Sequence, residues 1–286
     1  MDTSTPRPSP GNGGGRAGRN LGAAIAVGAG LAALVLVSLL TVKQTFLVVV
    51  AAAIVLGVRE LTAVLARRAV RLPTVPLTVA AVAMVPAAYY AGYAGCIGVV
   101  VATLAFSVIW RMPSGPSGFV RDVAGGTFAV TYLPLLAAFV VFMLRAEDGP
   151  VRVLTFIVAT VGSDVGGYAV GALWGRHPLA PRISPHKTRE GAAGSLLLAV
   201  TGGWLAVTLL LHGAWWQGVL LGGLVAAAAT IGDLTESMIK RDAGVKDMGH
   251  LLPGHGGVMD RLDSLLMAAP VAYLALAWMI PSPLAL

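Results

Sequence analysis

Residues 124–144 read AGGTFAVTYLPLLAAFVVFML, a run without a charged side chain that would be apolar on every face of a helix. A second such run, GAAIAVGAGLAALVLVSLLTV, occupies residues 22–42. At 1.5 Å per residue, a helix of about 20 residues crosses the roughly 30 Å hydrocarbon core of a bilayer. A β-barrel is excluded, because its strands alternate polar and apolar residues. These runs predict an all-α polytopic membrane protein.

The composition of the 286-residue chain agrees with a membrane location. Hydrophobic residues make up 57% of it, charged residues only 12%, and the mean hydropathy is +0.81. A water-soluble fold of this length could not bury so much apolar surface. The single cysteine, Cys96, excludes an intramolecular disulfide and a cysteine-based zinc site. No nucleic-acid partner is expected, since cations that flank the spans explain the net charge of +7.

The positive charges predict how the chain is oriented. We predict about nine transmembrane helices, at roughly 21–42, 45–58, 74–93, 95–110, 124–144, 150–174, 192–212, 215–236 and 263–280. Lys and Arg accumulate on the cytoplasmic side of membrane proteins. With a cytosolic N-terminus, that side receives all of the 20 Lys and Arg residues except Lys43, Arg145 and Arg152.

Three regions are expected along the chain. Residues 1–20 are rich in Pro, Gly and Ser and are predicted to form a disordered cytosolic tail. A cleaved signal peptide is disfavoured, because the apolar run that follows is too long. Residues 21–158 form an N-terminal transmembrane region, and residues 159–286 a C-terminal catalytic transmembrane region with cytosolic loops. Within the first, residues 59–72 fit a helix lying on an anionic leaflet as well as they fit ordinary flanking charge.

The sixth span carries a carboxylate, Asp164, beside Ser163. A charge inside a span costs about 2.5–3.5 kcal/mol on insertion scales, so Asp164 is predicted to face a cavity or a partner. A polar contact that only joins helices is the alternative. The glycines of this span recur every four residues, at 162 and 166 and again at 167, 171 and 175. This spacing predicts that a neighbouring helix approaches closely.

The loop that follows, GRHPLAPRISPHKTREG at residues 175–191, is rich in cations and stiffened by three prolines. Its cations are Arg176, Arg182, Lys187 and Arg189. Clustered cations of fixed geometry suit a nucleotide triphosphate or a lipid phosphate, and a solvated positive-inside loop is the alternative. Glu190 lies among them and is expected to fix their positions.

The segment SMIKRDAGVKDMGHLLPGHGGVMDRLD, residues 237–263, concentrates charge between two apolar runs. Helical spacing gives one face of the eighth span Asp233, Glu236, Ser237 and Lys240, and the start of the ninth Asp260, Asp263 and Ser264. A few carboxylate oxygens with room for water and phosphate are what Mg²⁺ takes in phosphate chemistry. The glycine-rich residues 254–257 would let backbone amides approach phosphate oxygens. Together these features indicate a phosphoryl or nucleotidyl transfer site.

Other interpretations exist for single residues of this segment. Asp260 fits an N-cap of the ninth helix, where the helix dipole favours a carboxylate. His250 and His255 lack a third nitrogen or sulfur ligand nearby, which disfavours zinc. A histidine that contacts phosphate or caps a helix fits better.

The segment resembles the signature of phosphatidate cytidylyltransferases, membrane enzymes that make CDP-diacylglycerol from CTP and phosphatidic acid. The matching residues, at the family's spacing, are Ser237, Lys240, Arg241, Lys246, Asp247, His255, Gly256, Gly257, Asp260, Arg261 and Asp263. Ser163, Asp164 and residues 179–191 are similar to the family's second characteristic stretch. His186 and Arg189 depart from it, since the family more often has Lys and an aromatic or apolar residue there. The specific resemblance covers about residues 160–265.

The resemblance implies a magnesium-dependent transfer of CMP from CTP to phosphatidic acid, among the lipids of a bacterial plasma membrane and on its cytosolic side. It places the metal ligands on Asp233 and Asp260, suggests a nearby potassium ion and leaves a homodimer open. Asp164 and Asp263 would orient ligands or water. The phosphates would be held by Lys187, Lys240, Arg241, Lys246 and Arg261. The CTP contacts would also include Ser184, Ser237, Gly256 and Gly257, and Glu190, Asp247 and His255 complete the catalytic set.

Two other functions fit parts of the pattern. A CTP-dependent lipid or polyprenol kinase, which would transfer the γ-phosphate instead of CMP, is the nearer alternative. A cation transporter could use Asp164 and Asp233 along its path, but it would spread acids through the depth of the membrane. This chain instead gathers acids and bases at one surface.

Overall fold

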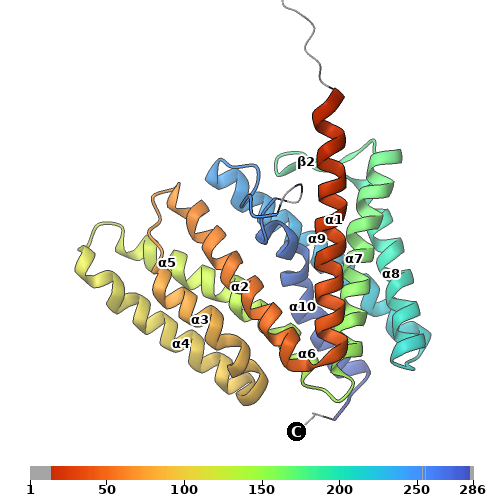
Figure 1. Ribbon diagram of the computed structural model, residues 1–286, viewed down its shortest axis with the longest axis horizontal. Helices are drawn as coiled ribbons and strands as arrows, with labels where there is room; N and C mark the ends of the chain where they lie inside the picture. The colour runs from red at the N-terminus through yellow and green to blue at the C-terminus, as the bar shows by residue number, and fades with distance from the viewer. Residues whose placement is uncertain (1–13, 253, 255, 284–286) are drawn as a thin grey trace, which may run out of the picture.

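The residues that the structure describes form a bundle of helices with one small β-hairpin (Figure 1). The computed structural model describes residues 14–252, 254 and 256–283. The helices are α1 (Gly14–Thr41), α2 (Lys43–Ala66), α3 (Thr74–Pro86), η1 (Ala87–Ala91), α4 (Gly92–Arg111), η2 (Met112–Ser114), α5 (Phe119–Val130), η3 (Thr131–Leu135), α6 (Leu136–Leu144), α7 (Gly149–Trp174), α8 (Arg189–Leu210), α9 (Trp215–Ala243) and α10 (Met259–Met279). The strands are β1 (Pro178–Ala180) and β2 (Ser184–Thr188), which pair antiparallel.

Seven helical segments of the described chain are long and apolar enough to cross a membrane. The predicted all-α polytopic membrane fold is therefore confirmed. One of the seven, Thr74–Ser114, contains both α3 and α4, and the chain turns between them at Gly92, where φ is +63°. Glycine tolerates this left-handed backbone without strain. α4 consequently runs back along α3 (Figure 1).

In the N-terminal half, helices extend beyond the predicted spans at two places. The backbone of residues 14–20, which fall in the tail predicted over residues 1–20, is helical, and residues 1–13 lie outside the described chain. Residues 59–66 continue α2, so the separate surface helix, one of the two interpretations left open for residues 59–72, does not form over this range. α2 extends beyond its apolar run because Ala, Leu, Arg and Glu, which make up most of residues 59–66, are good helix formers. The same effect carries α9 to Ala243, beyond the predicted end at 236.

The C-terminal half is built on backbone contacts between α7, α8 and α9. A Cβ atom added to Gly166 of α7 would lie 2.2 Å from the carbonyl oxygen of Gly194 on α8. On α9, a Cβ at Gly222 would lie 2.3 Å from the carbonyl oxygen of Ala199. Only glycine permits helices to approach this closely. The predicted role of the glycines in the sixth span is confirmed.

A buried cation joins α7 to α10 at the ends of these helices that lie away from the signature segment. Arg152 Nε donates to Asp148 Oδ1 at 2.6 Å, and its two terminal nitrogens donate to the carbonyl oxygens of Leu276 and Ile280. Burial alone would raise the pKa of Asp148, but hydrogen bonds from Arg152 and Ser282 and the charge of Arg152 outweigh it and hold that pKa below its usual range. This contact fixes the relative position of the two helices that carry Asp164 and Asp263.

Candidate active site

A cavity of about 620 Å³ lies among α7, α8, α9, α10 and the β-hairpin. The predicted site residues that line it are Asp164, Ser184, Lys187, Asp233, Asp260, Arg261 and Asp263. These side chains come from both sequence motifs, which are separated by α8 and most of α9 in the chain. The fold therefore brings the cation-rich loop and the signature segment to one site.

An ion pair joins the two motifs directly. Lys187 Nζ, on β2, lies 2.6 Å from Asp233 Oδ2 on α9. Ser237, one turn further along α9, donates to Asp233 Oδ1 at 3.4 Å. Both side chains of the ion pair are partly buried, with 22% and 35% of their surfaces exposed. The pair fixes the hairpin over the end of α9.

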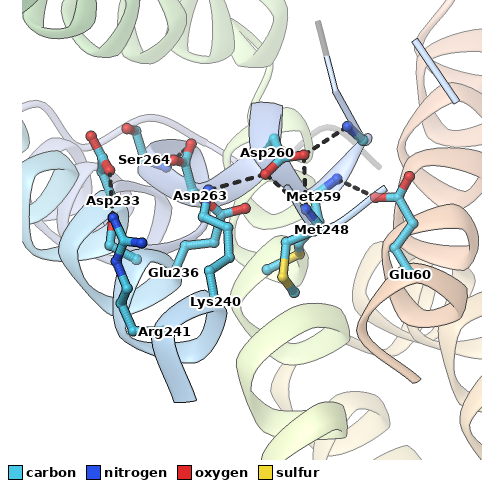
Figure 2. A network of polar contacts seen from close by, with 12 residues as sticks. Glu60, Asp233, Glu236, Lys240, Arg241, Met248, Met259, Asp260, Asp263 and Ser264 are labelled. Carbon is cyan, nitrogen blue, oxygen red and sulfur yellow. Dashed lines mark hydrogen bonds and ion pairs between the residues drawn. The ribbon is translucent and has the colours of Figure 1, made fainter. Parts of the chain in front are cut away.

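The carboxylate of Asp260 organises the loop that precedes α10 (Figure 2). Its Oδ2 accepts a hydrogen bond from Gly257 N at 2.7 Å, and both of its oxygens lie 3.2 Å from Met248 N. Lys240 Nζ lies 3.0 Å from Asp260 Oδ1. The N-cap residue of α10 is Val258, so Asp260 is not the N-cap of this helix. Its carboxylate instead folds the loop back on the first turn of α10.

Two further carboxylates lie beside Asp233. Ser264 Oγ donates to Asp164 Oδ1 at 3.0 Å, and Ser264 N donates to Asp263 Oδ1 at 2.7 Å. The negative charge of Asp233 acts on both Asp164 and Asp263. One wall of the cavity therefore carries three carboxylates, from α7, α9 and α10.

Glu236 is a part of this network that was predicted to share a helix face with Asp233 but not to belong to the site. Its side chain is fully buried, and Oε2 accepts a hydrogen bond from Lys240 Nζ at 2.5 Å. Among the described residues, Glu236 Oε1 has no hydrogen-bond partner. Lys240 thus links a buried glutamate to Asp260 (Figure 2), and it is not among the described side chains that line the cavity. The three- and four-residue spacing of the acids on α9 was the signal that could have identified Glu236.

Glu190 holds the start of the hairpin together. It accepts hydrogen bonds from the backbone N–H groups of Arg176 and His177, at 3.1 and 3.2 Å, and contacts His177 Nδ1 at 2.6 Å. We expected Glu190 to fix the cationic side chains of this loop. The contacts show that it fixes the backbone that carries them.

The remaining predicted residues lie outside the cavity lining that the structure describes. Arg241 Nε donates to the carbonyl oxygen of Ile183 at 3.3 Å and so joins α9 to the turn of the hairpin. Lys246 and Asp247 are exposed, and Asp247 lines a second cavity, of about 590 Å³, against α2. Gly256, at φ +78°, pairs with Leu252 in an isolated bridge. His255 lies outside the described residues.

Comparison with known proteins decides the family of this chain. A family model described as the cytidylyltransferase family matches residues 22–279. The chain belongs to the cytidylyltransferase family. Its relatives include the phosphatidate cytidylyltransferase of Mycobacterium leprae, 39% identical over 274 residues that cover 90% of this chain and 88% of the relative. That of Mycobacterium tuberculosis H37Rv is 36% identical over 91% of this chain and 84% of its own, and that of Synechocystis is 42% identical over 52% of each.

This cytidylyltransferase family member has carboxylates suited to a magnesium ion that also binds phosphate. No three His, Cys, Asp or Glu side chains of the described residues are arranged to hold an ion by themselves. Mg²⁺, however, usually takes one or two protein carboxylates and completes its shell with water and substrate phosphates. Asp233 already lies against a positive charge, the ammonium of Lys187 at 2.6 Å, and shares its cavity with Asp260. This donor set fits a metal ion held jointly by the protein and a nucleotide.

Proposed function

We propose that the protein is a CTP:phosphatidate cytidylyltransferase, which transfers CMP from CTP to phosphatidic acid and releases pyrophosphate. The names of its relatives support the substrates. The observation that carries the proposal is the Lys187–Asp233 ion pair, because it brings the cation-rich hairpin and the carboxylates of the signature segment to one cavity. A cavity with both kinds of charge suits a triphosphate and its metal ion.

The reaction forms a bond between a phosphate oxygen of phosphatidic acid and the α-phosphorus of CTP, while the bond between the α-phosphorus and the bridging oxygen breaks. A phosphate monoester is largely ionised near neutral pH, since its second pKa is about 6, so the attacking oxygen needs no general base. Lys187 and Arg261 line the cavity and would neutralise the charge that gathers on the phosphate oxygens. Most of the rate would come from positioning and charge neutralisation.

The proposal assigns Mg²⁺ to Asp233 and Asp260, with Asp164 and Asp263 orienting ligands beside it. When bound, the ion would neutralise phosphate oxygens and orient the triphosphate. Asp260 is held by Lys240 and by loop amides, so its carboxylate stays in place without reorganisation. Ser264 similarly fixes Asp164 and Asp263.

The membrane topology belongs to the same proposal. Nine spans result when α3 is counted separately from α4 and α1 is added to the seven long segments; the apolar part of α1 is Ile25–Thr41. A cytosolic N-terminus then places the cavity at the cytosolic boundary of the plasma membrane, because most Lys and Arg residues fall on that side. The acyl chains of the lipid would remain in the leaflet while its headgroup enters the cavity.

Parallel incubations with CTP labelled on the α- or the γ-phosphate test the proposed reaction. The purified protein in mixed micelles with phosphatidic acid should convert the α-label, and not the γ-label, to a lipid-soluble product. Label from the γ-phosphate in the lipid would instead establish a lipid kinase. Asp233→Asn provides the matched control, since it should form much less of the lipid-soluble product than the wild type.

A further inference from the structure

Glu60, on α2, contacts the start of the helix that carries Asp260 and Asp263. Its Oε1 accepts a hydrogen bond from Val258 N at 3.0 Å, and its Oε2 accepts one from Met259 N at 2.8 Å (Figure 2). Nearly 200 residues separate these partners in the sequence. A single carboxylate from the N-terminal half therefore engages two consecutive amides of the signature segment.

These two amides belong to a helix end that needs an acceptor. The first N–H groups of a helix have no intrahelical partner, and a carboxylate near them is favoured by the helix dipole. The N-cap residue of α10, Val258, makes no side-chain cap in the described structure. Glu60 thus performs from another helix what a local Ser or Asp usually does.

The loop around Glu60 is shaped to the carboxylate. A Cβ atom at Gly249 would lie 2.3 Å from Glu60 Oε1, and one at Gly257 would lie 2.5 Å from Glu60 Oε2. Gly257 also donates its N–H to Asp260 at 2.7 Å. Glu60, Gly257 and Asp260 consequently form a continuous set of contacts from α2 to the cavity.

We propose that Glu60 is a positioning residue for the transfer reaction: by holding the amides of residues 258 and 259, it fixes the direction in which Asp260 and Arg261 enter the cavity. The inference rests on the proposed function for its kinetic part only. Glu60 lines the second cavity and not the one that holds Asp260 and Arg261, so the proposed role involves no contact between Glu60 and a substrate. Its effect reaches the site through the backbone.

Three variants test this role: Glu60→Ala, Glu60→Gln and, as a control, Glu147→Gln. Glu147 is an exposed glutamate between α6 and α7, away from the signature segment. We expect Glu60→Ala to lower kcat by roughly 10- to 100-fold, the usual effect of losing a residue that supports a metal or substrate ligand. Glu60→Gln keeps one carbonyl oxygen as an acceptor and should fall between Glu60→Ala and the wild type. Glu147→Gln should stay within about twofold of the wild type.

A second measurement separates positioning from general stability. Hydrogen–deuterium exchange of a peptide covering residues 256–262 should be faster in Glu60→Gln than in the wild type, while peptides from α7 and α8 stay unchanged. A Glu60→Gln protein with wild-type kcat and exchange would overturn the inference, as would a lower melting temperature with unchanged kcat. If Glu60→Ala does not fold, Glu60→Gln decides. If the wild type transfers no CMP, the proposed function fails, and the exchange comparison still shows whether Glu60 holds α10.

Discussion

Removing the charge of Lys187 should expose the energetic coupling of the two motifs. Lys187 Nζ and Asp233 Oδ2 are 2.6 Å apart and partly buried, so their interaction is worth more than a surface ion pair. A hydrogen bond that involves a charged group contributes about 1.5–3 kcal/mol, and each 1.4 kcal/mol changes a rate or equilibrium tenfold. Lys187→Met should therefore lower kcat/KM by roughly 10- to 100-fold.

The double variant provides the sharper result. If Lys187 and Asp233 act as a unit, the loss in Lys187→Met/Asp233→Asn should be much smaller than the product of the two single losses. The assay is incorporation of α-labelled CTP into lipid at several CTP concentrations. Arg182→Met removes an exposed cation from the same hairpin, outside the described cavity lining, and should stay within about twofold of the wild type. Losses that multiply in the double variant would refute a coupled pair.

Three further predictions concern packing, pH and metal. Gly166→Ala should lower the free energy of unfolding by about 1–3 kcal/mol, because its Cβ would lie 2.2 Å from Gly194 O. Gly98→Ala is the control and should leave the free energy of unfolding unchanged, because the space around Gly98 is open. Thermal denaturation in detergent compares the two variants. Asp148→Asn should cost about 1 kcal/mol at neutral pH, since Arg152 loses its charged partner. The pKa of Asp148 is depressed in the folded state, so the stabilisation by its ion pair is present above the ordinary value of 3.8 and is lost as the pH falls through the lower folded value. The difference in melting temperature between Asp148→Asn and the wild type should therefore shrink over that pH range. A difference that stays constant would contradict the role of the Asp148 charge. A chelator should abolish CMP transfer and added Mg²⁺ restore it, whereas full activity in excess chelator would exclude the proposed metal.

The sequence predicted the class of fold and the composition of the cavity for different reasons. Apolar runs identify membrane helices because the bilayer leaves the backbone few other structures. Asp164 could be found because a charge inside a span is costly, Lys187 because cations cluster in its loop, and Asp233 because acids recur at helical spacing along its span. Helix ends were predicted less well: α2, α9 and α10 continue into charged segments where hydropathy gives no signal.

Contacts that depend on tertiary structure could not be predicted. Glu60 follows an arginine in a segment that resembles an ordinary cytosolic flank, and its pairing with the amides of Val258 and Met259 involves backbone groups that every residue except proline has. The backbone role of Glu190 was missed for the same reason. By contrast, spacing alone would have suggested the contact of Glu236 with Lys240, four residues apart on α9.

The glycine contacts between α7 and α8 have a consequence for the size of the cavity that holds the candidate active site. Where helices meet through side chains, a small loss of volume at one position can be offset by a rotamer change at another. At Gly166 the neighbouring atom is a main-chain oxygen, which has no rotamer to change. The distance between α7, which carries Asp164, and α8, which follows Lys187, is thus set by the contact between their backbones. Substitutions among the lipid-facing side chains of either helix should leave this distance unaltered.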